Sequence, residues 1–220
     1  MPPVAAPSVL APLVPVPPVL GLILAGGLAR RMGGGDKPLR NLGGRTLLDR
    51  VVSRLEPQCG GGLILNANGD PRRFPNFPGR IVPDGVPDNP GPLAGILAGL
   101  DHAAAHHPGL THVVSVSGDA PFLPLDLVAR LVGSGSGASI VMAASGPREH
   151  FTVALWPVAL RGDLRHALVE RGERRVGAFL KAHEAVAVSW PVEPFDPFLN
   201  INAPEDLAAA ESILAEFERD

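Results

Sequence analysis

A glycine-rich segment at residues 24–39, LAGGLARRMGGGDKPL, combines groups that can approach a ligand closely with groups that can contact phosphates. Gly26 and Gly27 have no Cβ, so the backbone there can pass close to a ligand and point its N–H groups at it. The cations that follow the two glycines are Arg30, Arg31 and Lys37. Such cations suit a triphosphate. The segment matches neither GxxxxGK(S/T) nor GxGxxG, which disfavours a P-loop kinase and a dinucleotide dehydrogenase.

Composition narrows the possible chemistry further. The chain has 220 residues and a formal net charge of −3 from 19 basic and 22 acidic residues, which argues against a nucleic-acid binder held by phosphate contacts. Cys59 is the single cysteine, so an intramolecular disulfide and a cysteine-rich metal centre are excluded. A lone cysteine fits a reducing cytoplasm. Only Lys37 and Lys181 are lysines among the 19 basic residues, which singles out Lys37 inside the glycine segment.

Short apolar runs alternate with amphipathic segments along the rest of the chain. Strands are expected at 19–24, 62–66, 80–83, 112–116, 138–143, 151–156 and 185–190. Helices are expected at 46–56, 92–106, 124–132, 158–169, 175–181 and 204–217. This alternation predicts an α/β fold, a Rossmann-like three-layer α/β/α sandwich around a mostly parallel sheet.

Polar groups follow three of these expected strands. The glycine loop follows Leu24, Asn66 ends the second strand, and Asp119 follows the fourth. In open parallel sheets, ligands bind outside the carboxyl ends of the strands. The three features should therefore share one edge of the sheet and form a binding site there.

The N-terminal residues 1–17 differ from the rest in composition. No charged side chain precedes Arg30, but seven prolines interrupt the apolar run, at positions 2, 3, 7, 12, 15, 17 and 18. Proline in a helix interior costs about 3 kcal/mol, and no basic region precedes the apolar part, so neither a membrane helix nor a signal peptide is expected. We expect a disordered or polyproline-II tail at 1–17 and a single domain at 18–220.

Several motifs together resemble one known family. The glycine segment resembles the signature of nucleotidyltransferases with a glycosyltransferase-A-like fold, the type that includes nucleotide-diphospho-sugar transferases. Further matches are Asn66-Ala67-Asn68, GPLAG at 91–95, DAPF at 119–122, HFT at 150–152, ERRV at 173–176 and NINAPE at 200–205. Within this group the chain resembles the molybdenum cofactor guanylyltransferases, the MobA family, over roughly residues 19–215.

The resemblance implies an activity. Members of this family transfer GMP from GTP to the phosphate of molybdopterin and release pyrophosphate. The acceptor phosphate is already anionic near neutral pH, so no general base is needed, and the sequence shows no Ser–His–Asp or Cys–His arrangement. Expected partners are GTP and molybdopterin as substrates and a molybdoenzyme or cofactor-delivery protein, with no nucleic acid and no membrane.

The resemblance also implies roles for single residues. It assigns the guanine and ribose side of GTP to the backbone of Leu24, Ala25, Gly26 and Gly27 and to the side chains of Asn66 and Asp84. It assigns the phosphates to Lys37, assisted by Arg31, and a Mg²⁺ ion to Asp119. Mg²⁺ prefers one or two carboxylates completed by phosphate and water.

Structural alternatives stay open for several of these positions. Asn66 could cap a strand end, Asp84 could belong to a turn, and residues 91–95 could serve helix–sheet packing instead of the nucleotide. Asn202 is a candidate partner near the metal or the cap of the last helix. The remaining candidates, for the acceptor, are His150, Thr152, Arg174 and Arg175.

Two other functions remain possible. One is a different nucleotidyltransferase, such as a molybdopterin cytidylyltransferase, which the pair Gly26-Gly27 disfavours because a residue without Cβ leaves more room for a purine. The other is a non-catalytic nucleotide-binding protein, which would have no need to retain Lys37 and Asp119. The family pattern is also not matched everywhere: Gly118 stands where a polar or sulfur side chain is frequent, and Ala203 where Thr is frequent.

Overall fold

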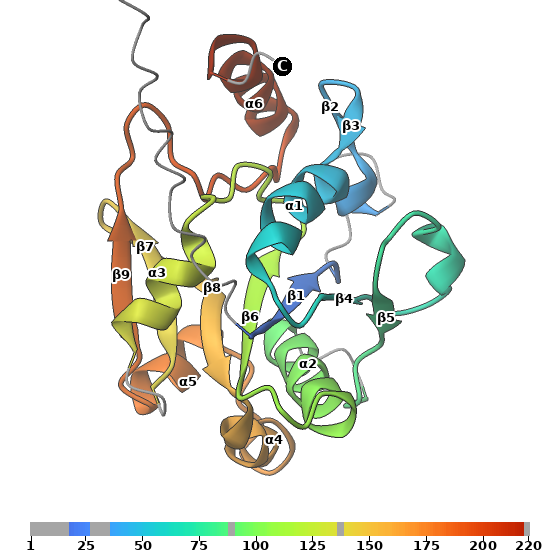
Figure 1. The fold of residues 1–220 in the computed structure, drawn as a ribbon, viewed down its shortest axis with the longest axis vertical. Coiled ribbons are helices and arrows are strands. Elements are labelled where there is room, and N and C mark those ends of the chain that lie inside the picture. The colour runs from blue at the N-terminus through green and yellow to red at the C-terminus, as the bar shows by residue number, and fades with distance from the viewer. Residues whose placement is uncertain (1–17, 27–35, 88–90, 136–138, 218–220) are drawn as a thin grey trace, which may run out of the picture.

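The computed structural model describes residues 18–26, 36–87, 91–135 and 139–217. Its core is a seven-stranded sheet in the order β5-β4-β1-β6-β8-β7-β9 (Figure 1). The strands are β1 (Leu20–Leu24), β4 (Leu63–Asn66), β5 (Arg80–Val82), β6 (His112–Ser117), β7 (Val141–Ser145), β8 (Arg148–Pro157) and β9 (Val186–Trp190). Only β8 runs antiparallel to its neighbours in this sheet, so the prediction of a mostly parallel sheet is confirmed.

Helices cover both faces of the sheet (Figure 1). On one face the core contains side chains of α1 (Leu47–Leu55) and α3 (Leu127–Ser134), and on the other those of α2 (Pro92–His106), α4 (Arg161–Val169) and α5 (Val176–Ala182). Neighbouring residues of β1 illustrate the two sides, because Ile23 packs with the first group and Leu22 with the second. The predicted three-layer sandwich is therefore confirmed.

Local sequence signals account for where helices begin. Thr46 caps α1: its hydroxyl accepts the N–H of Asp49 at 3.0 Å, and the Asp49 carboxylate accepts the N–H of Thr46 at 3.2 Å. Helix α2 begins with Pro92 at its first position, where a missing N–H costs nothing. These two helices have the bounds that the sequence predicts, to within one residue.

Other predicted bounds were wrong by a few residues. The helix predicted at 124–132 begins at Leu127, whose N–H bonds the carbonyl of Pro124 in a turn that precedes the helix. The helix predicted at 158–169 is a 3₁₀ turn, Val158–Leu160, followed by α4. The strand predicted at 151–156 extends over 148–157, with a register shift opposite Met142 and Ala143.

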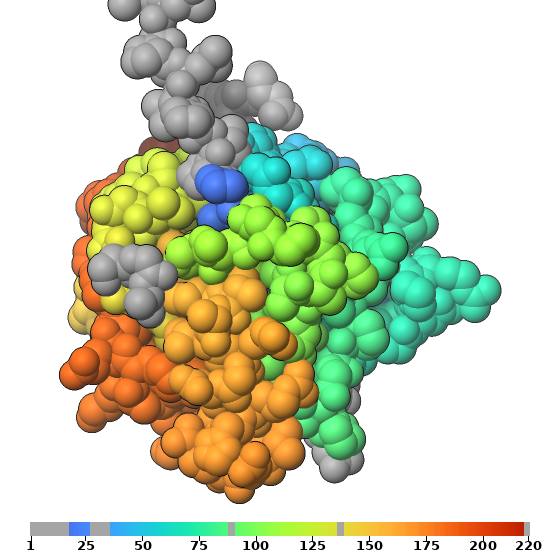
Figure 2. Space-filling view, turned by 60° about the horizontal axis from the view of Figure 1, so that its bottom comes forward, coloured from blue at the N-terminus to red at the C-terminus, as the bar shows by residue number. Residues whose placement is uncertain are grey.

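Helices α2 and α4 lie side by side on the face shown in Figure 2. Arg165 on α4 contacts Asp101 on α2 through an exposed ion pair, and Arg161 lies 4.0 Å from the same carboxylate. Exposed pairs of this kind contribute little, so the apolar core beneath them holds the two helices together.

The last helix, α6 (Pro204–Phe217), lies apart from the two helical layers, near the hairpin of β2 (Asn41–Leu42) and β3 (Arg45–Thr46) (Figure 1). A third apolar cluster, which includes Leu42, Phe122, Ile201 and Ala210, holds it there. The tail predicted at 1–17 lies outside the described residues, and within the described ranges no helix is long and apolar enough to cross a membrane.

Candidate active site

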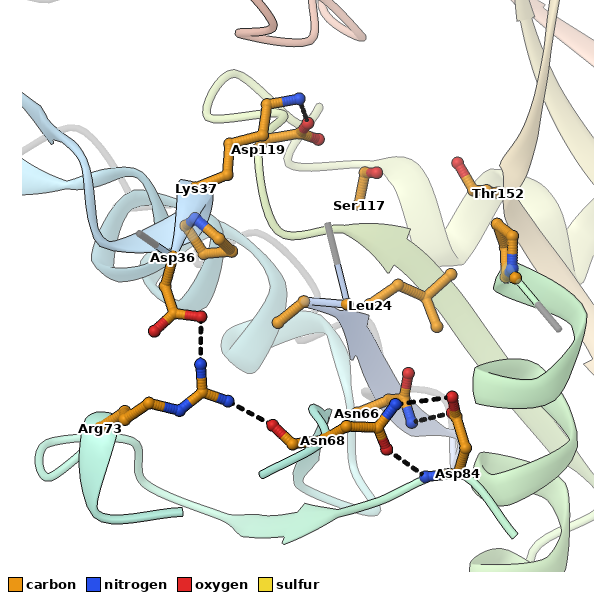
Figure 3. Close-up of a pocket in the computed structure, with 15 residues that line it drawn as sticks. Leu24, Asp36, Lys37, Asn66, Asn68, Arg73, Asp84, Ser117, Asp119 and Thr152 are labelled. Atoms are coloured by element: carbon orange, nitrogen blue, oxygen red, sulfur yellow. Dashed lines mark hydrogen bonds and ion pairs between the residues drawn. The ribbon is translucent and has the colours of Figure 1, made fainter. Parts of the chain in front are cut away.

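A pocket of about 490 Å³ opens at the carboxyl ends of the central strands (Figure 3). Its size is within the usual range for sites of small-molecule ligands. The lining residues are Leu24, Ala25, Gly26, Asp36, Lys37, Pro38, Asn66, Asn68, Arg73, Asp84, Gly91, Pro92, Ser117, Asp119 and Thr152.

The pocket brings together the residues that sequence reasoning had selected from distant parts of the chain. Those that line it are Leu24, Ala25, Gly26, Lys37, Asn66, Asp84 and Asp119. Parallel pairing explains this convergence, because β4, β1 and β6 end at the same edge and each contributes the residue at or just after its end. Gly27, Arg30 and Arg31 lie outside the described residues.

Lys37, Asp119 and Asn202 meet at one side of the pocket, and we call them the charged cluster. The Lys37 ammonium donates to Asp119 Oδ2 and to Asn202 Oδ1. Lys37 opens a short 3₁₀ helix, Lys37–Leu39, and its side chain is 12% exposed while that of Asp119 is 14% exposed. A nearly buried ammonium is therefore held between a carboxylate and an amide oxygen.

Asn202 does not cap α6 with its side chain. Instead Asp206, in the first turn of α6, accepts the N–H groups of Asn202 and Ala203 at 2.8 and 2.9 Å. This leaves the Asn202 side-chain oxygen directed at Lys37, and its amide group 3.4 Å from the carbonyl of Asn200.

The second oxygen of Asp119 is the feature that suits a metal ion. Asp119 Oδ1 is buried and has no hydrogen-bond partner among the described residues. A buried carboxylate oxygen without a donor is costly unless a cation or ligand satisfies it. No group of three His, Cys, Asp or Glu side chains in the described ranges could hold a metal by itself, so a cation at Asp119 would take further ligands such as water or a bound phosphate.

Asn66, Asn68 and Asp84 form a second polar group, which we call the amide clamp. The Asn66 amide donates to Asp84 Oδ1 at 2.9 Å, and the Asn68 amide donates to Asp84 Oδ2 at 2.8 Å. Asn68 Oδ1 in turn accepts the N–H of Asp84 at 2.8 Å. Both carboxylate oxygens of Asp84 thus have donors within the protein, so the three side chains hold one another without a ligand.

Glycines allow α2 to approach the amide clamp. A Cβ on Gly95 would lie 2.2 Å from Asn66 Oδ1 and 2.9 Å from Leu24 Cδ2. Gly95 therefore serves close packing of α2 on the sheet, while Gly91 and Pro92 at the start of the helix line the pocket. Pro92 has no N–H, so it has no backbone hydrogen bond to donate to a bound nucleotide.

Sequence reasoning missed part of one wall. Arg73, at the end of a 3₁₀ helix (Pro71–Arg73), contacts the Asp36 carboxylate and the Asn68 carbonyl and so joins the residue before Lys37 to the amide clamp (Figure 3). Asn68 could have been predicted from the sequence, since it belongs to the Asn66-Ala67-Asn68 motif. Arg73 could not have been predicted in this way, because it is one of 17 arginines and its partner Asp36 is 37 residues away in the sequence.

The acceptor candidates lie in different surroundings. Thr152 lines the pocket. Arg174 donates to the carbonyl of Leu168 at 2.7 Å, and Arg175 is 82% exposed beside Glu173. Hydrogen bonds from Arg175 lower the pKa of the Glu173 carboxyl.

His150 is an interior residue, 6% exposed, and burial lowers its pKa, with a raising influence from Asp196 and a lowering one from Arg148. Its Nε2 lies 2.6 Å from Ser145 Oγ, and Ser145 donates to Asp196 at 2.9 Å. Ser145, His150 and Asp196 therefore form a hydrogen-bonded group in the interior. The order differs from that of a nucleophilic triad, because the serine hydroxyl donates to the carboxylate and the histidine is not its base.

A near-buried ammonium and a carboxylate at the carboxyl edge of a mostly parallel sheet are typical of α/β proteins that bind nucleotides. Residues 21–186 match the MobA-like NTP transferase domain family. The chain belongs to that family and is a nucleotidyltransferase.

A curated relative supports this assignment. A protein named molybdenum cofactor guanylyltransferase from Bradyrhizobium sp. (strain ORS 278) is 55% identical over 204 residues, which cover 92% of this chain and 96% of the relative. A second relative of that name, from Nitrobacter hamburgensis, is 52% identical over 204 residues, covering 92% and 97% of the two chains.

Solved structures share the fold. The molybdopterin-guanine dinucleotide biosynthesis protein A of Archaeoglobus fulgidus superposes with a TM-score of 0.68 at 23% identity and covers 90% of this chain and 100% of its own. A Mycobacterium tuberculosis protein solved in complex with manganese superposes with a TM-score of 0.63 at 15% identity, and the match covers 89% of this chain and 99% of that protein. Divalent metal use is typical of nucleotidyltransferases, and the orphaned oxygen of Asp119 fits it.

Proposed function

We propose that this protein transfers GMP from GTP to the terminal phosphate of molybdopterin, with release of pyrophosphate. An acceptor phosphate oxygen forms a bond to the α-phosphorus of GTP while the bond from that phosphorus to the β-phosphate oxygen breaks. One observation carries the proposal: Lys37 and Asp119, whose Oδ1 has no partner among the described residues, line one pocket in a chain that is 55% identical to a protein named for this reaction.

The nucleoside part of GTP is assigned to the side of the pocket that holds the amide clamp. Asn66 and Asp84 present amide and carboxylate groups that suit the donor edge of guanine or the ribose hydroxyls. Backbone groups of Leu24, Ala25 and Gly26 line the adjacent wall. A Cβ on Gly26 would have no atom of the described residues within 4 Å, which leaves room for a ligand beside Gly26 on the side of those residues.

The triphosphate is assigned to the charged cluster. Lys37 supplies a positive charge to the α-phosphate and the leaving pyrophosphate, and Arg31 assists from the glycine segment. Asp119 would hold Mg²⁺, which supplies charge neutralisation for the phosphates when bound. When no metal ion is bound, the Lys37 ammonium neutralises the Asp119 carboxylate. The lysine and the metal ion would therefore compete for the same carboxylate.

The acceptor is assigned to the second half of the chain, on the side of Thr152, with Arg174 and Arg175 as candidate contacts for its phosphate. Because the attacking oxygen is already anionic, the chain's task is to hold two anions in line and to stabilise charge on the leaving group. Asn202 belongs to the charged cluster on the triphosphate side, since it reaches Lys37 from the segment before α6.

The wider setting follows from this assignment. Residues 18–220 act as one domain, with a nucleotide-binding first half and an acceptor-binding second half. The product would pass to a molybdoenzyme or a cofactor-delivery protein in the cytoplasm.

Pyrophosphate release tests the proposal directly. The protein is incubated with Mg²⁺ and GTP, with and without molybdopterin, and with CTP and ATP in parallel. Release that requires both GTP and molybdopterin is the expected result. Release with CTP instead would make the protein a cytidylyltransferase, and no release with any nucleotide would indicate a non-catalytic nucleotide-binding protein.

A further inference from the structure

The connection between β9 and α6, residues 191–203, leads from the outermost strand of the sheet to the last helix (Figure 1). We call it the crossing segment. It leaves Trp190 at the end of β9, and near its other end the N–H of Ile201 bonds the carbonyl of Asp119 at 3.0 Å. The next residue is Asn202, which contacts Lys37. The position of Asn202 therefore depends on how this segment is held.

Three polar side chains hold the middle of the crossing segment. The Ser145 hydroxyl donates to Asp196 Oδ1 at 2.9 Å, and its oxygen lies 2.6 Å from His150 Nε2. Because the single hydroxyl proton of Ser145 is directed at Asp196, the Ser145 oxygen is the acceptor toward His150. The Nε2–H group of His150 is therefore the donor of that hydrogen bond. Ser145 is 1% exposed and His150 6%, so water does not compete for the bond between them, whereas Asp196 is half-buried.

An aromatic side chain adds a second fixed point. Phe198 is 1% exposed, and its ring centroid lies 4.6 Å from that of His150 and 5.4 Å from that of Trp190. The N–H of Phe198 donates to Asp196 Oδ1 at 3.0 Å. The same carboxylate oxygen thus fastens both Ser145 and the backbone two residues further along. His150 supports Phe198 through its ring and Asp196 through Ser145.

We propose that Ser145, His150 and Asp196 are positioning residues for the nucleotidyl transfer: they fasten the crossing segment so that Asn202 meets the Lys37 ammonium. Only three residues separate Phe198 from Asn202, and Ile201 is fully buried, so a shift at 196–198 displaces the backbone that carries Asn202. Asn202 itself is exposed and gives its side-chain oxygen to Lys37. Without the Asn202 oxygen, Asp119 is the remaining acceptor of Lys37 in the charged cluster. The Lys37 ammonium then leaves its position between Asp119 and Asn202.

The test uses a matched pair of substitutions at one position. His150→Phe removes the donor but keeps a ring against Phe198, whereas His150→Gln keeps an N–H donor near the place of Nε2. Ser145→Ala is a smaller change that removes the bridging oxygen alone. Leu168→Ala serves as the control for general destabilisation, because Leu168 is buried on the opposite face of the sheet.

The readout takes advantage of the composition of the chain. Lys37 and Lys181 are its only lysines, so protein labelled with [13Cε]lysine gives two side-chain resonances by NMR. Lys181, on α5, is exposed and serves as the internal reference. Asn202→Ala defines where the Lys37 resonance lies when the amide oxygen is missing, and Lys181→Arg assigns the pair.

We expect His150→Phe and Ser145→Ala to move the Lys37 resonance toward its position in Asn202→Ala, with Lys181 unmoved. The kcat for pyrophosphate release should fall about tenfold, as is usual when a partner that orients a site residue is lost. The KM for GTP should change less than about twofold, because the amide clamp is untouched. His150→Gln should restore both the resonance and kcat, and Leu168→Ala should leave the Lys37 resonance in place.

A Lys37 resonance at its wild-type position in folded His150→Phe and Ser145→Ala would overturn the proposal. So would an equal shift in Leu168→Ala, since the effect would then be one of general stability. If His150→Phe does not fold, Ser145→Ala decides. The kinetic comparison rests on the proposed function, but the resonance does not, so a chain without GTP activity would still reveal whether the three residues position Asn202.

Discussion

The amide clamp and the charged cluster lie on opposite sides of Leu24 in the same pocket (Figure 3), and they differ in how far their polar groups are satisfied. In the clamp, both oxygens of Asp84 have amide donors. In the cluster, one oxygen of Asp119 holds Lys37 and the other has no partner among the described residues.

This difference indicates a division of labour. A fully bonded clamp keeps its shape without a ligand, which suits recognition of a base and ribose at little cost in ordering. An incompletely bonded carboxylate beside an ammonium suits groups that change partners when phosphates arrive. The clamp should therefore determine nucleotide affinity, and the cluster should determine the rate of transfer.

The largest effect should come from the charged cluster. Lys37→Ala and Asp119→Ala should each lower kcat/KM for pyrophosphate release by at least about 10²–10³-fold, or roughly 3–4 kcal/mol of transition-state stabilisation. Each removes charge where it develops in the reaction. Lys181→Ala, at the other lysine, should stay near the wild-type rate, and near-native turnover in either cluster variant would contradict the assignment.

Substitutions at two glycines test the role of the amide clamp in nucleotide binding. Gly95→Ala places a Cβ 2.2 Å from Asn66 Oδ1, so it should lower the free energy of unfolding by about 1–3 kcal/mol and weaken GTP binding together. Gly26→Ala meets no atom of the described part of the chain within 4 Å and should weaken GTP binding at nearly unchanged stability.

Thermal unfolding and GTP titration of both glycine variants give the comparison. A Gly26→Ala protein that binds GTP normally would mean that the nucleotide does not approach the backbone at Gly26.

Lys37 and a cation compete for Asp119, so removing Lys37 should strengthen metal binding although it lowers the rate of transfer. Without nucleotide, Lys37→Ala should bind Mn²⁺ about tenfold more tightly than the wild type, because the ammonium no longer occupies and repels at the carboxylate. Electron paramagnetic resonance of free Mn²⁺ measures this, with Asp119→Asn as the variant that should lose the site. Equal affinity in wild type and Lys37→Ala would show that lysine and metal do not compete.

The smallest effect concerns acid stability. His150 is held neutral, with its pKa lowered chiefly by burial, so the unfolded chain takes up its proton more readily than the folded one. The stabilisation is complete above the unfolded pKa of about 6.5 and is lost as the pH falls below it. His150→Gln should therefore show a flatter decline in unfolding free energy between about pH 7 and 5.

His102 also has a lowered pKa, chiefly from burial, and contributes to the same decline in both proteins. Denaturant unfolding at several pH values checks the prediction. An identical slope in wild type and His150→Gln would contradict it.

The amino-acid sequence by itself determined the α/β class, the strand ends that carry Leu24, Asn66 and Asp119, and the starts of α1 and α2. These depend on local physics, since apolar runs, a capping box and a proline at a helix start act within a few residues. The glycine segment with its lysine was likewise readable, because its chemistry is contiguous.

Only the tertiary structure decided which side chains share a partner. Arg73 reaches Asp36, Asn202 reaches Lys37 over 165 residues, and Ser145 joins His150 to Asp196. The orphaned oxygen of Asp119 could not be predicted from the sequence either. Hydrogen bonds depend on distances of a few ångströms between segments whose approach is fixed by core packing, and the order of residues along the chain does not encode that approach locally.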